Sequence, residues 1–466
     1  MKSSLRPRAW CLLVSGIFSI IIPLQASKTN IIAIVTDDQA TWSLGAYGNS
    51  DPMTPHMDRL AREGILFSRA FVCSPVCSPS RATYLTGKYP TQIGITDWIA
   101  PSEAAAGLGL PEHLPTWPEV LQKHGYSTGL IGKWHLGDQP PFHPKRRGFD
   151  HFFGFLGGGN TPMHPMLERQ GVTRRFEGYG ADLLTDDALA FIEEHQRRPF
   201  ALLLHFREPH APYAPVPDSD AAVFESLDPS LPEASAMNTS QLKKWTREYH
   251  ASVRSVDRNL GRILLHLDQL NLASETIVLF TSDHGYMIGH HGLRHKGNAH
   301  WYAGGVRGPK RPNMFEYSIR VPWIMRWPGV IQPGKRIDEL VSQVDMFASV
   351  LGMLQIPMPD GYEQEGHDLS GLVMGESHVA RRFIFGQYDL HNNGLAYMRM
   401  IRTKKWKLVR HFKTHFMDEL YNLEEDPDET RNLYRQSRFA TVRASLADLL
   451  ALKMQQVSDP LLGDVY

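Results

Sequence analysis

Residues 30–38 read Asn30-Ile31-Ile32-Ala33-Ile34-Val35-Thr36-Asp37-Asp38, a run of apolar residues that ends in two acids. The apolar part is nearly continuous, and most of its residues are β-branched. Such a run is typical of a strand that is buried on both faces, as in a parallel sheet. The stretch therefore predicts a central strand with Asp37 and Asp38 at its carboxyl end.

The same pattern, an apolar strand that runs directly into polar residues, recurs along the chain. Further strands of this kind are predicted at residues 127–131, 200–206 and 276–280. The polar residues that follow the four strands are Asp37 with Asp38, Lys133 with His135, His210, and Asp283 with His284. Helical patterns alternate with these strands, which predicts an α/β fold with a mostly parallel central sheet flanked by helices. Because ligands bind at the carboxyl ends of parallel strands, we expect these polar residues to meet in one crevice.

The size and composition of the chain predict a large main domain and a smaller one. The chain has 466 residues, of which 42% are hydrophobic. That is enough for a large core. After about Gly375 the pattern changes to short strands followed by a helix at 440–457, which predicts a small antiparallel sheet. We therefore expect a main domain at 27–375 and a C-terminal subdomain at 376–466. Lys and Arg equal Asp and Glu at 49 each, which gives no indication of a nucleic-acid partner.

The N-terminus has the pattern of a signal peptide at residues 1–26. A basic start is followed by an apolar run at 11–24 and by a cleavage site at 24–26. The run is short for a membrane span and contains Pro23. The alternatives are an uncleaved anchor or a buried N-terminal strand. We expect an exported protein, periplasmic or secreted, with no stable membrane insertion after cleavage.

Residues 77–87 have the layout of a helix start. Ser78 is expected to be the N-cap and Pro79 the first helical residue, with Gly87 ending the helix. Cys77 would then lie at a helix N-terminus, where free N–H groups and the helix dipole favour an anion. Arg81, one turn into the helix, can point back to the same place and add hydrogen-bond donors.

Asp37 and Asp38 are adjacent acids at a strand end, and Asp283 and His284 form a second such pair. Three carboxylates and one imidazole at one edge of a sheet predict a site for a divalent metal. Carboxylate oxygens suit Ca²⁺ or Mg²⁺, whereas a histidine ligand leaves Zn²⁺ or Mn²⁺ open. The alternative is that these acids only cap neighbouring helices.

Two stretches resemble the motifs of one enzyme family. Residues 77–87, Cys-Ser-Pro-Ser-Arg-Ala-Thr-Tyr-Leu-Thr-Gly, match the sulfatase signature Cys-x-Pro-Ser-Arg-x-x-x-Leu-Thr-Gly at every fixed position. Residues 132–137, Gly-Lys-Trp-His-Leu-Gly, resemble the second sulfatase motif without a mismatch. An ungapped match of this length is specific, and further similarity at 402–408 and 419–427 extends it over nearly the whole mature chain. The resemblance is to the type I, formylglycine-dependent sulfatases and implies an alkaline phosphatase-like fold.

The resemblance also implies a cofactor and a set of site residues. In this family the signature cysteine becomes formylglycine (3-oxoalanine), an aldehyde, so a maturation enzyme is expected to modify Cys77. One Ca²⁺ is expected as well. The ligands implied for this ion are Asp37, Asp38, residue 77, Asp283 and His284. The other catalytic residues implied are Arg81, Lys133, His135, His210 and Lys296.

The expected roles follow from the charges of these side chains. Arg81, Lys133 and Lys296 would neutralise a bound sulfate. Asp283 or His135 would act as the base, and His210 or Lys296 as the acid.

The lysine at 296 has an alternative in Lys310, which lies nearer to the family-like segment at 315–322. We prefer Lys296 because its Lys-Gly-Asn context resembles that of the family. The surrounding stretch, Gly292–Arg311, is rich in Gly, His, Lys and Arg and is expected to be an irregular loop over the crevice. Histidines in this region are expected to be polar loop residues or sugar contacts, with a His-rich metal tract as the alternative.

The two cysteines of the mature chain allow a further test. A Cys-x₃-Cys pair in an exported protein could form a disulfide between Cys73 and Cys77. A buried free thiol is the plain alternative. Conversion of Cys77 to an aldehyde would exclude the disulfide.

The expected activity is hydrolysis of a sulfate ester, which makes the protein a sulfuric ester hydrolase. A sulfated carbohydrate is the expected substrate by family analogy, in the context of polysaccharide degradation. The alternatives are a phosphonate or phosphodiester hydrolase of the same superfamily, or an inactive protein that binds sulfated glycans.

Overall fold

The structure is a computed structural model that describes residues 1, 29–233, 236–376 and 378–464. The expected signal peptide at 1–26 therefore lies, except for Met1, outside the described residues. Among the helices of the described part of the chain, none is both long enough and apolar enough to cross a membrane.

A ten-stranded sheet forms the centre of the molecule, with the strand order β14-β2-β13-β8-β1-β7-β3-β4-β5-β6. Its strands are β1 (Asn30–Thr36), β2 (Ile65–Phe71), β3 (Ser127–Lys133), β4 (His151–Phe155), β5 (Met166–Arg169), β6 (Val172–Arg175), β7 (Phe200–His205), β8 (Thr276–Ser282), β13 (Trp323–Arg326) and β14 (Lys335–Ser342). The run from β8 to β4 is parallel, and β14 pairs with β2 in parallel. This arrangement confirms the predicted α/β fold with a mostly parallel sheet.

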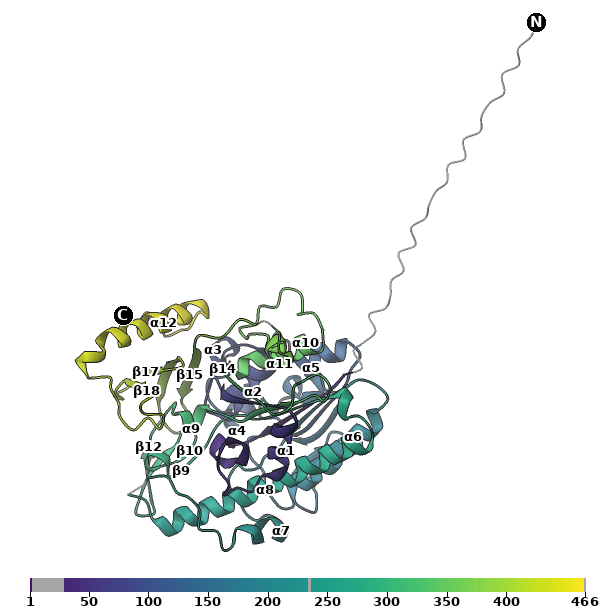
Figure 1. Cartoon of the computed structure of the whole chain (residues 1–466), viewed down its shortest axis with the longest axis horizontal. Helices are drawn as coiled ribbons and strands as arrows, with labels where there is room; N and C mark the ends of the chain where they lie inside the picture. Colours follow the sequence, from purple (N-terminus) through teal and green to yellow (C-terminus); the bar gives the residue numbers. More distant parts are fainter. Residues whose placement is uncertain (2–28, 234–235, 377, 465–466) are drawn as a thin grey trace.

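Helices cover both faces of this sheet (Figure 1). One face carries α1 (Pro55–Glu63), α6 (Gly180–His195) and α8 (Thr239–Gln269), and the other carries α2 (Cys77–Thr86), α5 (Trp117–Lys123) and α10 (Met346–Met353). The shorter helices are α3 (Pro90–Ile93), α4 (Pro101–Ala105), α7 (Asp218–Ala221), α9 (Glu316–Ile319) and α11 (Ser370–Met374). On β1, Ile32 and Ile34 face the α1–α6–α8 layer, while alternate residues such as Ile31 face the other core. Strand β1 is therefore buried on both faces because its side chains alternate between two cores.

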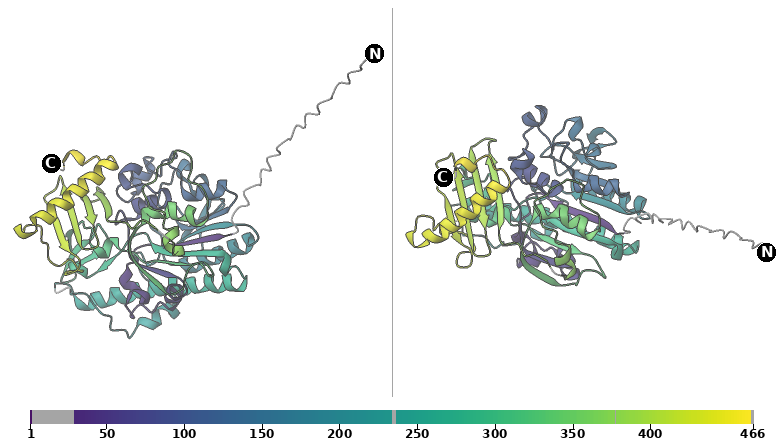
Figure 2. Two further views of the ribbon diagram at one scale, coloured as in Figure 1. Left: turned by 45° about the horizontal axis from the view of Figure 1, so that its top comes forward. Right: turned by 90° about the horizontal axis from the view of Figure 1, so that it is seen from above.

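The C-terminal part forms its own antiparallel sheet, seen beside the main body in Figure 2. Its strands are β15 (Ile384–Leu390), β16 (Ala396–Arg402), β17 (Trp406–Phe412) and β18 (Glu419–Asn422), in the order β15-β16-β17-β18. Helix α12 (Ala440–Gln456) packs Leu446, Leu450 and Met454 against Ile401 and Leu408 of this sheet. The predicted small antiparallel subdomain is confirmed, while the domain boundary at residue 375 stays a prediction.

The stretch Gly292–Arg311 is not the irregular loop that its composition predicts. It contains β10 (Leu293–His295), β11 (His300–Ala303) and β12 (Val306–Lys310), which form a four-stranded sheet with β9 (Met287–Ile288). Gly304 and Gly305, both with positive φ, form the two-residue turn between β11 and β12. An edge-to-face contact between Tyr302 and Trp245 of α8, with ring centroids 5.3 Å apart, holds the hairpin against the main body. The loop prediction was wrong because it followed the polar composition of the stretch, whereas Trp301, Tyr302 and Val306 beside the turn favour strands.

Helix α8 runs without interruption through Gly261, although glycine is an unfavourable residue inside a helix. A Cβ at position 261 would lie 2.6 Å from the imidazole of His56 in α1. The glycine therefore permits close packing of the two helices and does not mark an end of the helix.

We expect Lys407→Met to lower the free energy of unfolding by about 3–5 kcal/mol, because it leaves the buried carboxylate of Glu429 without its cation, whereas Glu316 keeps Arg402. Lys407 is fully buried in β17, and its Nζ lies 3.0 Å from Glu316 and 2.5 Å from Glu429. Denaturant unfolding measures the change. Lys405→Met is the control, since Lys405 is exposed and pairs with Glu424 at the surface. Equal stability of both variants would contradict the expectation.

We expect the stability of the protein to depend on pH through Asp257, which accepts backbone hydrogen bonds from His56 and Met57 at the start of α1. Burial raises the pKa of Asp257 to about 7. The folded state then keeps a proton that the unfolded state releases near pH 4, so this stabilisation is complete below that pH and is lost as the pH rises through about 7. Between about pH 5 and about pH 8 the wild type should lose about 2 kcal/mol more than Asp257→Asn. Parallel stability curves for the two proteins would refute this.

Candidate active site

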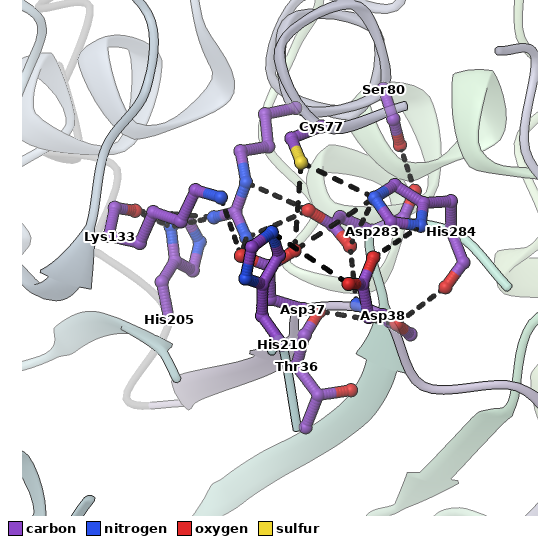
Figure 3. Close-up of polar contacts among 12 residues, drawn as sticks. Thr36, Asp37, Asp38, Cys77, Ser80, Lys133, His205, His210, Asp283 and His284 are labelled. Atoms are coloured by element: carbon purple, nitrogen blue, oxygen red, sulfur yellow. Dashed lines mark hydrogen bonds and ion pairs between the residues drawn. The ribbon is translucent and has the colours of Figure 1, made fainter. Parts of the chain in front are cut away.

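The polar residues that follow β8, β1, β7 and β3 lie together because these four strands are neighbours in the sheet and run parallel. Figure 3 shows Asp37, Asp38 and Asp283 converging near Cys77. Residues from distant parts of the sequence are thus brought to one edge of the sheet, as the strand pattern predicts.

Helix α2 presents Cys77 to this edge of the sheet. The helix begins at Cys77 itself with Val76 as the capping residue, so the expected N-cap role of Ser78 is wrong. The Ser78 hydroxyl instead accepts a hydrogen bond of 2.9 Å from the backbone N–H of Ile99, which fixes the next loop. Gly87 ends the helix with a φ of 69°, as expected.

Cys77 is almost completely buried among charged side chains. Its Sγ lies 3.0 Å from Nζ of Lys296, 3.4 Å from Nε2 of His284 and 3.6 Å from Oδ1 of Asp37. Burial raises the pKa of the Cys77 thiol, but Lys133, Lys296 and His284 outweigh it and hold this pKa well below its ordinary value. The position therefore stabilises negative charge at residue 77.

The acids around Cys77 form a site that fits a divalent cation. Ligand atoms of Asp37, Cys77, Asp283 and His284 all lie within 4.8 Å of one another, and all four residues are buried. Asp38 belongs to a second, overlapping group with Asp37 and His210. Burial and the charge of Asp37 raise the pKa of Asp283 to about 6. Oxygen-rich, crowded carboxylates of this kind suit a hard cation such as Ca²⁺, which would offset their mutual repulsion.

Each carboxylate of the site also has a cationic partner. Arg81 pairs with Asp283 at 2.9 Å, Lys133 with Asp37 at 2.5 Å and Lys296 with Asp38 at 2.8 Å. Arg81 lies on α2, one turn after Cys77, as the sequence predicts. Together the three form a cationic wall that can hold an oxyanion against residue 77.

Two histidines lie at the rim of this cluster. His135 has a φ of 61°, in the left-handed region, and its Nε2 lies 3.1 Å from the carbonyl oxygen of Ile99. A Cβ at Gly158 would lie 2.6 Å from the His135 ring, so a glycine is needed there. His210 is 21% exposed at its side chain and lies 3.8 Å from Asp38. Burial lowers the pKa of His210, and the charges of Asp38 and Asp37, which act to raise this pKa, do not outweigh burial.

The two candidate lysines occupy different places. Lys296 is buried and reaches both Asp38 and Cys77. Lys310 instead donates a hydrogen bond of 2.7 Å to the carbonyl oxygen of Asn392 in the C-terminal subdomain. Only Lys296 of these two therefore contacts residue 77, although both line the same cavity.

Sequence reasoning missed residues that position the site. His205, the last residue of β7, lies 2.9 Å from the Lys133 carbonyl oxygen and 3.3 Å from Nη1 of Arg81. Gln343 accepts from Ser80 of α2 and donates to the Ser282 carbonyl oxygen. His205 carried a signal, a polar residue at a strand end, whereas Gln343 had none because its role depends on the position of β14.

The histidines of the β9–β12 region divide into two pairs. His290 packs against Tyr317 with tilted rings whose centroids lie 4.0 Å apart, and His291 stacks on Phe315 with centroids 3.8 Å apart. His295 and His300 line the cavity above Cys77. Among the described residues, none of the four belongs to a group that could hold a metal ion.

The site opens into a cavity of about 480 Å³. Its wall is formed by Cys77, Trp98, Ile99, Pro101, His135, Gly158, Gly159, His210, His295, Lys296, Asn298, His300, Arg307, Lys310 and Asn393. The β11–β12 hairpin and the β15–β16 loop thus both contribute to the space next to the site.

A buried cysteine at a helix start thus faces acids and cations at the carboxyl ends of parallel strands, an arrangement that can bind a cation and an oxyanion side by side. The family model "Sulfatase" matches residues 29–356, and the model "N-sulphoglucosamine sulphohydrolase, C-terminal" matches residues 309–456. The chain belongs to the sulfatase family and is a sulfuric ester hydrolase.

Named relatives agree with this assignment. The ulvan-active sulfatase of Formosa agariphila is 30% identical over 454 residues, which cover 93% of this chain and 83% of that protein. The steryl-sulfatase of Homo sapiens is 29% identical over 465 residues, covering 82% of this chain and 76% of that protein. A solved structure of a protein with its substrate D-glucosamine-2-N,6-O-disulfate superposes with a TM-score of 0.81 at 24% identity, over 93% of this chain and 98% of that chain. At 24% identity, the similarity to this solved structure shows only that the two proteins share a fold.

Proposed function

We propose that this sulfatase hydrolyses sulfate esters of a carbohydrate, using a formylglycine made from Cys77 and one Ca²⁺. The observation that carries the proposal is the position of Cys77 Sγ. It lies within 3.6 Å of Asp37, His284 and Lys296, where a metal cluster and a cationic wall meet.

The residues present fit a calcium ion. Asp37, Asp38, Asp283 and His284, with residue 77, would hold it, and the buried Oδ2 of Asp38 has no hydrogen-bond partner among the described residues. When bound, such an ion neutralises sulfate oxygens and favours an ionised nucleophile. Zn²⁺ and Mn²⁺ are the alternatives that the imidazole of His284 leaves open.

A formylglycine hydrate supplies two hydroxyl groups, one to attack sulfur and one whose deprotonation releases the sulfate, which a thiol cannot do. The roles of the surrounding side chains follow from their positions. Arg81, Lys133 and Lys296 hold the charge of the sulfate against residue 77. His210 lies at the open rim and protonates the leaving oxygen of the ester. His135 or Asp283 accepts the proton from the hydroxyl at residue 77.

A carbohydrate substrate is supported by the cavity and by the relatives. The cavity of about 480 Å³ is large enough for a sugar residue, and the half-buried Trp98 in its wall offers an apolar face to a ring. The ulvan-active sulfatase is among the similar proteins. Export to the periplasm or outside the cell, through the signal peptide at 1–26, would bring the enzyme to such polymers.

A screen of sulfated oligosaccharides, with released sulfate and product structure measured, tests this function. Metal-loaded protein, produced together with a formylglycine-generating maturation enzyme, should release sulfate from at least one of them. Matched phosphonate and phosphodiester substrates should be turned over more slowly, which separates the alternative hydrolase. Binding of sulfated glycans without any turnover would support an inactive receptor and refute the proposal.

A further inference from the structure

The wall of the cavity above Cys77 carries positive charge without any acidic side chain. Among the lining residues of the described chain, none is an Asp or a Glu, whereas Lys296, Arg307 and Lys310 are cations. Lys296 belongs to the site at Cys77. Arg307 and Lys310 lie on the β11–β12 hairpin and have no contact with that site, so the mechanism leaves their charge unused.

Arg307 and Lys310 have no carboxylate partner within ion-pair distance among the described residues. Nη2 of Arg307 lies 2.5 Å from Nε2 of His300, and Lys310 donates to a backbone carbonyl. Burial and the charge of Arg307 lower the pKa of Lys310. The negative charge of Asp97 opposes this shift but does not cancel it. Asp97 itself is buried and accepts backbone hydrogen bonds from His391 and Asn392. Arg307 and Lys310 thus face the same cavity without a carboxylate in ion-pair contact among the described residues.

The hairpin that carries these cations is held in place. Tyr302 makes an edge-to-face contact with Trp245 of α8, with ring centroids 5.3 Å apart, and Arg311 pairs with Glu419 at 2.6 Å. The Lys310–Asn392 hydrogen bond joins its other side to the C-terminal subdomain. Because both ends are fixed, the cations are already positioned before a ligand arrives, which lowers the entropic cost of binding.

We propose that His300, Arg307 and Lys310 form a second anion subsite, which binds a sulfate or a carboxylate on the substrate other than the ester that is cleaved. This inference rests on the proposed function and makes it more specific. The preferred substrate is then a glycan with two or more anionic groups. The subsite recognises the additional anion through the guanidinium and ammonium groups, and the neutral imidazole of His300 orients Arg307.

Three matched disaccharides test the proposal: one monosulfated, one disulfated, and one with a single sulfate ester and a uronate carboxylate. The wild type should show a lower KM for one or both doubly charged compounds than for the monosulfated compound. Arg307→Gln/Lys310→Gln should raise that KM by roughly tenfold or more with little change in kcat, because charged hydrogen bonds made equally in ground and transition state are lost. Its effect on the monosulfated compound should be much smaller. Whichever doubly charged compound responds identifies the anion as sulfate or carboxylate.

The control is Arg435→Gln/Lys123→Gln, which removes the same charge from exposed positions outside the cavity. This control variant should not alter the difference in KM between the monosulfated and the doubly charged compounds. Equal effects of Arg307→Gln/Lys310→Gln on all three compounds, or no preference of the wild type for a second anion, would overturn the subsite.

Calorimetric binding to Cys77→Ala distinguishes failure of the subsite from failure of the proposed function. If no sulfate ester is turned over by the modified enzyme, the proposed function falls, while tighter binding of the doubly charged compounds still supports the subsite. If all three compounds are cleaved but bind alike, the subsite falls and the function stands.

Discussion

Cys77→Ala is expected to lower kcat for sulfate-ester hydrolysis on the order of 10⁵-fold or more, because losing a nucleophile removes most of an enzyme's acceleration. Alanine cannot be converted to an aldehyde, so the variant lacks the nucleophile. The cations and the acids of the site stay in place, so substrate binding should persist. Initial rates of sulfate release, measured with protein at high concentration, check the size of the loss.

Cys73→Ala is the matched control, since it makes the same change four residues earlier. Cys73 is buried and its Sγ lies 3.3 Å from Oγ of Ser342, away from the metal cluster. It should keep near-normal kcat, and both variants should unfold at temperatures close to that of the wild type. A Cys77→Ala protein that is well folded and still active would remove residue 77 from the chemistry.

Asp283→Asn is expected to lower kcat by roughly 10³-fold, the effect of losing several kcal/mol of charge stabilisation from a bound metal. Asp283 supplies a ligand atom to the cluster with Asp37, Cys77 and His284. Removal of its charge weakens the site for a divalent cation. A chelator should have a similar effect on the wild type, and added Ca²⁺ should restore its activity.

Thermal unfolding with and without Ca²⁺ gives a measurement that does not depend on turnover. An ion that binds only the folded protein raises the melting temperature of the wild type. Asp283→Asn should lose this rise, whereas Asp257→Asn, another buried acid-to-amide change, should keep it. An equal rise in all three proteins would place the ion elsewhere, and a larger rise with Zn²⁺ or Mn²⁺ would identify a different metal.

The edge of the sheet at which the site forms could be predicted from the sequence, because each long apolar strand is followed at once by polar residues. The order β8-β1-β7-β3 could not, since it does not follow the chain and depends on how helices cross the sheet. Adjacency of Asp283 to Asp37, and the pairing of Lys133 with Asp37, are consequences of that order. The sequence thus indicates which residues carry the chemistry, but it does not indicate how these residues are arranged in space.

Local reasoning failed where tertiary contacts decide the structure. Ser78 has the identity of an N-cap but hydrogen-bonds to Ile99 instead. Gly261 has the identity of a helix breaker but allows α1 to pack closely on α8. The β11–β12 hairpin was missed although Gly304 and Gly305 form a typical two-residue turn, because the Gly-, His-, Lys- and Arg-rich composition of the whole stretch indicates a loop.

The mass of the peptide that contains residue 77, measured in purified active protein, tests the central claim most directly. We predict a loss that corresponds to conversion of the thiol to an aldehyde, in a fraction of molecules that rises in proportion to specific activity. Cys73 should remain a free thiol, as it is in the structure. Full activity with an unmodified Cys77, or with a disulfide between Cys73 and Cys77, would contradict the claim.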